Sequence, residues 1–192
     1  VVSRGPGSRT PIARSLERGF LLLTDLGTTT YLQALDAAKA DELFRDAIEA
    51  LIKLQLASRP GVLPPYDEAL LRREIDLFPR WYLARHLGMT LTADEQAVLA
   101  SAATLVLANN LAQPTVYVHR DYMPRNLMVT EPNPGVLDFQ DAVFGPITYD
   151  VMSLFKDAFV SWDEERVLDW TARYWEKAKR AGLPVSADFG TF

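Results

Sequence analysis

Residues 116–150 read VYVHRDYMPRNLMVTEPNPGVLDFQDAVFGPITYD, and this stretch decides how the rest of the chain is interpreted. Two short apolar runs in it favour β structure, and the segment 131–135 between them, Glu-Pro-Asn-Pro-Gly, is typical of a hairpin turn. Asp121 and Asn126 bracket an earlier turn, and Asp138 lies at the end of the next apolar run. A hairpin of this kind would bring the three oxygen-bearing side chains together at one end.

The chemistry of these three side chains fits phosphoryl transfer. Mg²⁺ prefers hard oxygen ligands and binds through a few protein groups together with phosphate oxygens, so one amide and one carboxylate suffice. A further carboxylate outside the metal shell could orient an attacking hydroxyl and accept its proton. A single Asp in a loop is more often a simple turn former. The hypothesis therefore depends on the three side chains occurring together.

The composition restricts the class of protein. Of the 192 residues 48% are hydrophobic, which is enough for a globular core, and the absence of cysteine excludes disulfides and thiolate metal sites. The formal net charge of -5 argues against a nucleic-acid-binding protein, whose surface would be basic. No apolar run approaches the roughly 18 residues of a membrane span. We therefore expect a soluble, cytoplasmic protein that binds neither nucleic acid nor membrane. A monomer is the default expectation, which the composition does not decide.

The residues at both ends of the sequence indicate that it belongs to a longer protein. It starts at Val1 without an initiator Met, and residues 1–14 are polar and basic, with Gly, Ser and Pro but almost no periodicity. The last residue, Phe192, follows shortly after a strongly helical stretch. We expect a fragment, or a chain whose natural ends have been lost.

Periodicity predicts a mainly helical chain around the central stretch. The clearest amphipathic pattern covers 37–57, with apolar residues at helical spacing and charges on the other face. Other helical patterns, with caps at Asp67, Thr92 and Asp163, a break at Pro79 and stops at Gly88 and Gly182, cover 67–87, 93–111 and 148–182. The alanine-rich helix at 93–111 and a strand at 20–24 are both expected to be buried. The predicted fold class is α+β with a mainly helical body.

Two segments resemble a known superfamily. HRDYMPRN at 119–126 matches the H-x-D-x-x-x-x-N catalytic loop of the protein-kinase-like enzymes, and LDFQD at 137–141 resembles their Mg²⁺-binding aspartate segment. Protein kinases usually have Lys where this chain has Met123, which favours the small-molecule kinases of the aminoglycoside phosphotransferase family. Over residues 16–184 the chain is most similar to the bacterial anomeric kinases of N-acetylmuramate and N-acetylglucosamine in cell-wall recycling. The resemblance implies a protein-kinase-like fold whose mainly helical C-lobe carries a catalytic β-hairpin.

The resemblance also implies a role for each residue of the motifs. Asp121 would be the catalytic base, and Asn126 and Asp138 would bind Mg²⁺. As structural support of the site, His119 would pack under the loop and Asp150 would hydrogen-bond the loop backbone. The implied cofactors are ATP and Mg²⁺, and the implied acceptor is an amino sugar phosphorylated at its anomeric hydroxyl.

A nucleotide-binding segment and two domains follow from the same resemblance. FLLLTDLG would be the last strand of the N-lobe running into the hinge, so that Thr24, Asp25 and Leu26 would face the adenine. Residues 1–27 would combine an atypical leader with this strand and hinge. Residues 28–192 would form the helical C-lobe, truncated at its C-terminus.

The chain departs from the family pattern in one respect, and other functions are therefore still considered. Kinases of this superfamily hold the ATP phosphates with a glycine-rich loop and a strand-borne Lys, whereas the first Lys here is Lys39, past the hinge. Most of the N-lobe is therefore expected to be missing. The alternatives to an amino-sugar kinase are a phosphotransferase for aminoglycosides or other amino alcohols, and a catalytically inactive fragment.

The acceptor site is less well defined by the sequence. Glu74 and Arg85, on one helical segment, and Asp141, just after the metal-binding aspartate, are candidates for contacts with the acceptor. For the helical segment, a solvated face with an aromatic anchor is the simpler explanation.

Two further motifs are interpreted as having no role in the site. Asp188-Phe189-Gly190 repeats a metal-binding motif of protein kinases, but it lies far from Asn126 and no apolar strand precedes it. Gly5-Pro6-Gly7 follows no strand and lacks the later glycine of a phosphate-binding loop, so it is interpreted as part of a flexible tail.

Overall fold

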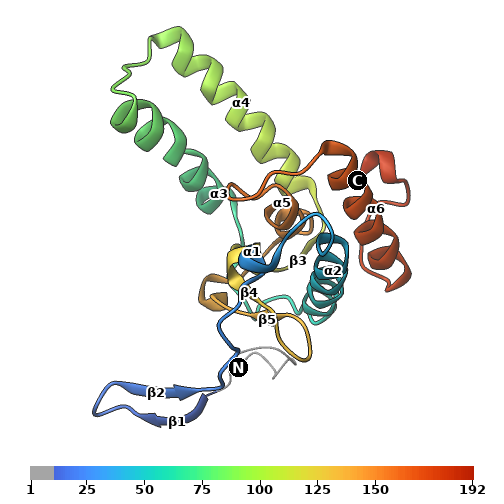
Figure 1. Cartoon of the computed structure of the whole chain (residues 1–192). Helices are drawn as coiled ribbons and strands as arrows, with labels where there is room; N and C mark the ends of the chain where they lie inside the picture. The colour runs from blue at the N-terminus through green and yellow to red at the C-terminus, as the bar shows by residue number, and fades with distance from the viewer. Residues whose placement is uncertain (1–10) are drawn as a thin grey trace.

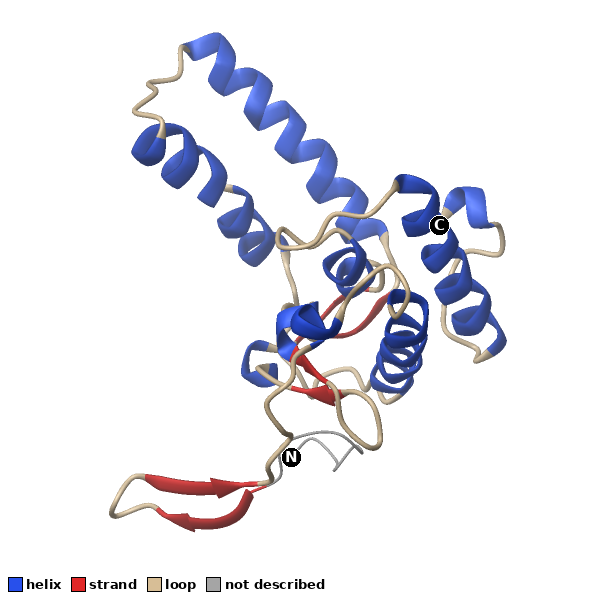
Figure 2. Ribbon diagram, in the orientation of Figure 1, coloured by secondary structure: helices blue, strands red, loops and turns tan. Residues whose placement is uncertain are grey.

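The computed structural model describes residues 11–192, which form a helical body with three small sheets (Figures 1 and 2). The strands are β1 (Pro11–Ser15), β2 (Phe20–Leu23), β3 (Thr115–Val118), β4 (Leu127–Met128), β5 (Gly135–Val136) and β6 (Val143–Pro146). The helices are α1 (Tyr31–Ala34), α2 (Ala40–Leu56), α3 (Glu68–Ile75), the π-helix η1 (Phe78–His86), α4 (Ala93–Ala112), α5 (Tyr149–Phe155) and α6 (Glu164–Arg180), with short 3₁₀ turns η2 (Pro124–Asn126), η3 (Phe139–Asp141) and η4 (Phe189–Thr191). None of the helices described is both long and apolar enough to cross a membrane. The predicted Gly5-Pro6-Gly7 tail lies outside the described residues.

Two antiparallel strand pairs carry the central stretch of the chain. β4 pairs with β5, with Leu127 opposite Val136, which confirms the predicted hairpin across the turn 131–135. β3 pairs with β6, with Val118 opposite Val143. Sequence analysis does not identify β6 as a strand, because its sequence VFGP contains Gly and Pro, which are depleted in strands. Long-range pairing with β3 makes it one.

The hydrophobic core forms where α2 meets α5, α6 and β3. Phe44, Ile48 and Leu51 of α2 are buried at helical spacing, which confirms the predicted amphipathic helix. The Phe44 ring packs edge-on against Phe155 and Trp170, with ring centroids 5.4 Å and 4.6 Å away. Because β3 lies on this core, the loop that follows it starts from a fixed position.

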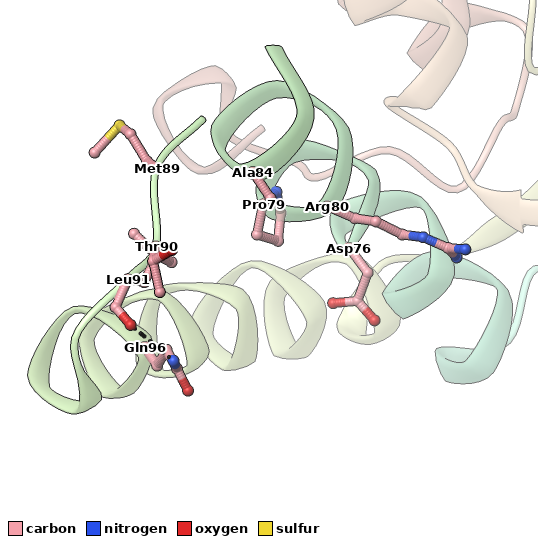
Figure 3. A pocket seen from close by; sticks show the side chains of 8 residues that line it. All are labelled: Asp76, Pro79, Arg80, Ala84, Met89, Thr90, Leu91 and Gln96. Carbon is pink, nitrogen blue, oxygen red and sulfur yellow. Dashed lines mark hydrogen bonds between the residues drawn. The ribbon is translucent and has the colours of Figure 1, made fainter. Parts of the chain in front are cut away.

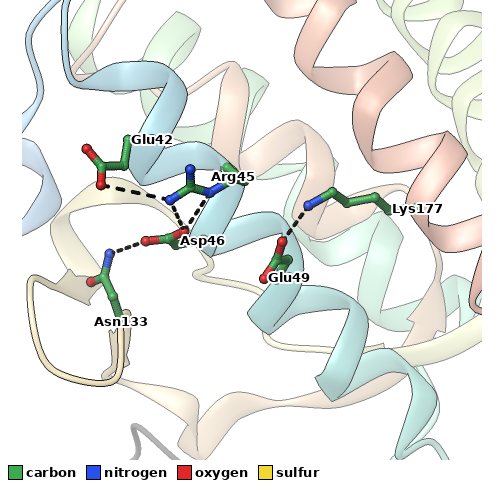
Figure 4. A network of polar contacts seen from close by, with 6 residues as sticks. All are labelled: Glu42, Arg45, Asp46, Glu49, Asn133 and Lys177. Atoms are coloured by element: carbon green, nitrogen blue, oxygen red, sulfur yellow. Dashed lines mark hydrogen bonds and ion pairs between the residues drawn. The ribbon is translucent and has the colours of Figure 1, made fainter.

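Polar contacts tie the hairpin turn and α6 to α2 (Figure 4). Asn133, in the turn between β4 and β5, donates through Nδ2 to Asp46 Oδ2 at 2.9 Å, and Arg45 pairs with the same Asp46 carboxylate. Lys177 of α6 pairs with Glu49 of α2 at 2.5 Å. The hairpin is therefore held at its turn as well as by its strands.

α3, η1 and α4 form a helical arm that extends from the body (Figures 1 and 2). Asp67 caps α3 by accepting from the Leu70 backbone N–H at 2.9 Å, and Thr92 and Glu95 form a capping box on α4, both as predicted. The predicted break at Pro79 is confirmed, since α3 ends before it and η1 follows in π geometry. Figure 3 shows a hollow on this arm, lined by Asp76, Pro79, Arg80, Ala84, Met89, Thr90, Leu91 and Gln96.

Two expectations about burial are wrong. β2 was expected to be buried but exposes 70% of Phe20, because with β1 it forms a two-stranded ribbon that projects from the helical body (Figure 1). The alanine-rich helix α4 was also expected to be buried, yet Leu105 is 74% exposed and the buried residues of the helix are Ala103 and Leu107. The apolar residues of α4 lie on all sides of the helix, whereas α3 covers only one side.

Gly145 of β6 is a position where a side chain should destabilise the fold. A Cβ there would lie 2.6 Å from the Cβ of the buried Tyr66. Gly145→Ala should therefore lower the free energy of unfolding by about 1–3 kcal/mol, measured by urea denaturation. The matched control is Gly190→Ala, whose Cβ would meet the exposed Asp188 side chain, and it should change stability by less than about 0.5 kcal/mol. Equal stabilities of the two variants would contradict this packing.

Candidate active site

Asp150 fixes the backbone of the loop that follows β3. It lies fully buried in the first turn of α5. The backbone N–H of His119 donates to its Oδ2 at 2.7 Å, and that of Arg120 donates to Oδ1 at 3.1 Å. These are the contacts that the family resemblance implies for Asp150. Because the two carboxylate oxygens hold consecutive amides, the loop leaves β3 in one defined direction.

Burial raises the pKa of Asp150 to about 7. The two N–H donors favour the ionised carboxylate and oppose this rise, while the negative charge of the nearby Asp121 adds to it. We therefore expect Asp150 to change its protonation state near neutral pH, where an exposed carboxyl would stay ionised.

This raised pKa predicts a pH dependence of stability. The folded state binds the Asp150 proton more tightly than the unfolded state, so the carboxyl stabilises the fold fully below about pH 4, and this contribution is lost as the pH rises through about 7. Relative to Asp150→Asn, the wild type should therefore lose free energy of unfolding between about pH 4 and pH 7, by at most about 1.4 kcal/mol per pH unit. Urea denaturation of both proteins across this range measures the difference. Parallel pH curves would be the contradicting result.

Asp121 begins a tight turn that ends at Asn126. The Asp121 carbonyl accepts from the backbone N–H of Met123 and from Asn126 Nδ2, each at 2.9 Å. The Asn126 backbone N–H donates in turn to the Met123 carbonyl at 2.8 Å. The side-chain nitrogen of Asn126 is thus occupied within the turn, and its amide oxygen is the atom that remains for a cation.

The β4–β5 ladder places Asp138 next to Asn126. The Leu137 backbone N–H donates to the Asn126 carbonyl at 2.9 Å, which extends the ladder by one step beyond β4 and β5. Asp138 follows directly, in a left-handed conformation with φ 67°, and turns the chain out of the strand. Its exposed carboxylate accepts from Gln140 Nε2 at 2.7 Å. The structure therefore brings Asp121, Asn126 and Asp138 to one end of the hairpin.

His119 packs beneath these carboxylates. Its ring lies edge-on to Tyr122, with centroids 5.8 Å apart, and within the described chain neither ring nitrogen has a hydrogen-bond partner. Burial lowers the pKa of His119, and the negative charge of Asp121, the nearby Leu137 backbone and the negative charge of Asp138 oppose the change. His119 is therefore a buried packing group whose ring lies within electrostatic reach of both carboxylates.

The donor set fits Mg²⁺ and does not form a closed metal cage. Residues 11–192 contain no group of three or more His, Cys, Asp or Glu side chains that could hold a metal ion. The Asn126 amide oxygen and the Asp138 carboxylate are hard oxygen donors on adjacent positions of the hairpin. Mg²⁺ commonly binds through one or two protein groups and completes its shell with phosphate oxygens and water. The partly exposed Asn126 amide and the exposed Asp138 carboxylate match that pattern.

The segment expected to contact adenine reaches the same hairpin. Leu26 lies against β5, because a Cβ on Gly135 would be 3.2 Å from Leu26 Cδ1. Asp25 Oδ1 accepts from the backbone N–H of Gly27 at 2.9 Å, which turns the chain, and Thr24 is half-buried before it. Leu26 of this segment thus lies against the hairpin that carries Asn126 and Asp138.

Of the three residues predicted to contact the acceptor, Glu74 and Asp141 both bind Arg120. Glu74 of α3 forms an ion pair with the Arg120 guanidinium, and Arg120 Nη1 donates to the Asp141 carbonyl at 3.5 Å. Arg85 is not brought to this place, since it lies on η1 with its guanidinium 5.8 Å from the centre of the Trp81 ring. Asp188, the other aspartate that resembles a metal ligand, accepts from the Thr191 hydroxyl at 2.9 Å.

Arg120 is the residue of the site that sequence reasoning missed. Its φ of 76° is left-handed, a conformation that costs a residue with a Cβ roughly 1–2 kcal/mol. Besides Glu74, its guanidinium faces the Tyr66 ring at 5.7 Å. The only signal in the sequence was its place between His119 and Asp121.

A sequence model of the phosphotransferase enzyme family (APH) matches residues 8–187. The chain is 58% identical over 180 residues to the N-acetylmuramate/N-acetylglucosamine kinase of Pseudomonas putida, an alignment that covers 94% of this chain and 53% of that protein. It is 57% identical over 190 residues to the protein of the same name from Pseudomonas aeruginosa, with coverages of 98% and 56%. The chain therefore spans about half the length of these curated relatives.

Solved structures share the fold. The aminoglycoside phosphotransferase APH(3'')-Id of Streptomyces rimosus, in complex with ADP and streptomycin, matches with a TM-score of 0.61 at 18% identity and covers 86% of this chain and 64% of that one. The gentamicin complex of APH(2")-IIa matches with a TM-score of 0.58 at 18% identity, with coverages of 91% and 61%. The predicted α+β, protein-kinase-like fold is confirmed at this level.

Proposed function

The chain belongs to the phosphotransferase enzyme family, and on that premise we propose that it acts in an ATP- and Mg²⁺-dependent kinase for the anomeric hydroxyl of N-acetylmuramate or N-acetylglucosamine. The observation that carries the proposal is the meeting of Asp121, Asn126 and Asp138 at one end of the β4–β5 hairpin. The identity of more than half the aligned residues to kinases named for these two sugars supports the choice of acceptor.

In the proposed mechanism Asp121 acts on the acceptor. Its carboxylate accepts a hydrogen bond from the anomeric hydroxyl, orients that oxygen toward the γ-phosphorus and takes its proton as the new P–O bond forms and the bond to the β-phosphate oxygen breaks. The Asn126 amide oxygen and the Asp138 carboxylate would hold Mg²⁺. When bound, this ion supplies positive charge beside the phosphate oxygens. The segment 24–26, whose Leu26 lies against the hairpin, would contact the adenine.

The charge state around Glu74 favours an N-acetylated sugar over an aminoglycoside. An aminoglycoside carries several ammonium groups and would need free carboxylates near the reacting hydroxyl. Glu74, an acidic side chain next to the catalytic loop, is paired with Arg120 and also accepts from the Tyr66 hydroxyl. Its charge is therefore already balanced within the protein. An amide-substituted sugar has no such requirement.

A panel of acceptors tests the proposed function. The full-length protein that contains this chain is supplied with Mg-ATP and, in separate reactions, N-acetylmuramate, N-acetylglucosamine, streptomycin and gentamicin, and transferred phosphate is measured. We expect transfer to the two sugars and none to the two aminoglycosides. Transfer to the aminoglycosides alone would favour the amino-alcohol alternative. Absence of both transfer and Mg-ATP binding by calorimetry would favour the catalytically inactive alternative.

A further inference from the structure

Glu74 connects the helical arm to the catalytic loop. It lies on α3 and forms an ion pair with Arg120, 46 residues further along the chain. The Tyr66 hydroxyl donates to the same carboxylate, and the Tyr149 hydroxyl lies 3.4 Å from its Oε2. The side chains of Glu74 and Arg120 are 25% and 23% exposed, so the pair is shielded from much of the solvent screening that weakens surface pairs.

Arg120 is held from two directions, directly before the proposed base Asp121. Its backbone N–H is bound by Asp150 on one side, and its side chain is bound by Glu74 on the other. Between these contacts the backbone adopts its left-handed φ of 76°. Non-glycine residues keep such a conformation where the surrounding structure imposes it. The direction in which Asp121 leaves the loop therefore depends on the contacts of Arg120.

A second ion pair on α3 provides a comparison, because it is exposed and lies within one helix. Glu68 and Arg72 of α3 lie 3.3 Å apart, one helical turn from each other, with side chains 61% and 42% exposed. This pair contacts no part of the loop and links residues within one helix. Glu74, in contrast, links two elements, and its partner is the neighbour of Asp121.

We propose that Glu74 is a positioning residue for phosphoryl transfer, which acts through Arg120 to keep the loop in the conformation that aims Asp121 at the acceptor. The inference rests on the proposed function for its effect on turnover. Its effect on the loop itself is independent of activity. The Tyr66 and Tyr149 hydroxyls also donate to the Glu74 carboxylate, which links the arm to the loop and to α5.

Glu74→Gln tests the proposal, because the substitution keeps the size of the side chain and removes its charge. Turnover should fall by about ten- to a hundred-fold, the scale of a slight misplacement of a catalytic group, with KM for ATP changed less than about twofold. Amide hydrogen exchange of the segment 119–126 should become faster. The matched control, Glu68→Gln, should change neither quantity.

A double substitution separates positioning from general stability. Glycine adopts a positive φ without the steric cost of a Cβ, so in an Arg120→Gly background Glu74 has nothing left to hold. Glu74→Gln should then reduce turnover less than about twofold further, and it should not speed exchange in the loop again. If Glu74→Gln fails to fold, Arg120→Lys takes its place, since Lys lacks the planar fork that matches a carboxylate.

The two readouts distinguish failure of this inference from failure of the proposed function. Unchanged loop exchange in Glu74→Gln would overturn the positioning role whether or not the protein is active. Equal losses of turnover in the wild-type and Arg120→Gly backgrounds would also overturn it. A wild type without transfer activity, but with faster loop exchange in Glu74→Gln, would uphold the positioning of the loop and overturn the proposed function.

Discussion

Asp121→Asn should lower the rate of phosphate transfer to N-acetylmuramate by about a hundred- to ten-thousand-fold, the usual contribution of a general base. The substitution replaces a proton acceptor with an amide that cannot take a proton. The contacts that shape the turn use the Asp121 carbonyl, which bonds Met123 and Asn126, and these do not depend on the side chain. The loss should therefore fall on turnover, and the binding of Mg-ATP should be retained.

Steady-state kinetics and calorimetry together check this prediction. Asp188→Asn is the matched control, because it makes the same change at an exposed Asp that lies away from the hairpin and accepts from the Thr191 hydroxyl. It should keep the wild-type rate. If the transfer rate of Asp121→Asn lies within about twofold of that of the control, Asp121 is not the base.

Asp138→Asn should reduce transfer by about a hundred- to a thousand-fold, because the charge that would hold Mg²⁺ is lost while the backbone is preserved. Asp138 has a left-handed φ of 67°, and Asn is among the residues that tolerate this region best. The hydrogen bond from Gln140 can still be accepted by the amide oxygen. The effect should thus report on charge and metal binding rather than on folding.

A Mg²⁺ titration of transfer at fixed ATP measures this effect. In Asp138→Asn the half-saturating Mg²⁺ concentration should rise by at least about tenfold, and part of the lost rate should return at high Mg²⁺. Gln140→Ala serves as the control for the hydrogen bond alone and should shift the titration much less. Identical Mg²⁺ dependence in wild type and Asp138→Asn would mean that another group binds the metal.

Local signals explain why several elements could be predicted from the sequence. The apolar spacing of α2, the capping box of Thr92 and Glu95, the break at Pro79 and the turn 131–135 all depend on residues a few positions apart. Such signals need no knowledge of the rest of the chain. They predicted the β4–β5 hairpin, at one end of which the three oxygen-bearing side chains lie.

The elements that were missed depend on contacts between distant residues. β6 becomes a strand by pairing with β3, and Gly145 within it is required by the close approach of Tyr66. The exposure of β2 and α4 is equally non-local, since an apolar sequence does not say whether another layer covers it. For the same reason the pairing of Glu74 with Arg120 could not be seen.

The position of the new phosphate ester tests the central claim most directly. The full-length protein that contains this chain is given Mg-ATP and N-acetylmuramate labelled with ¹⁸O at the anomeric oxygen, and the product is examined by ³¹P NMR, which detects ¹⁸O bonded to phosphorus. If Asp121 directs the anomeric hydroxyl at the γ-phosphate, a sugar phosphate forms with the label in the bridging position. An ester without bridging label, or no ester at all, would contradict the account.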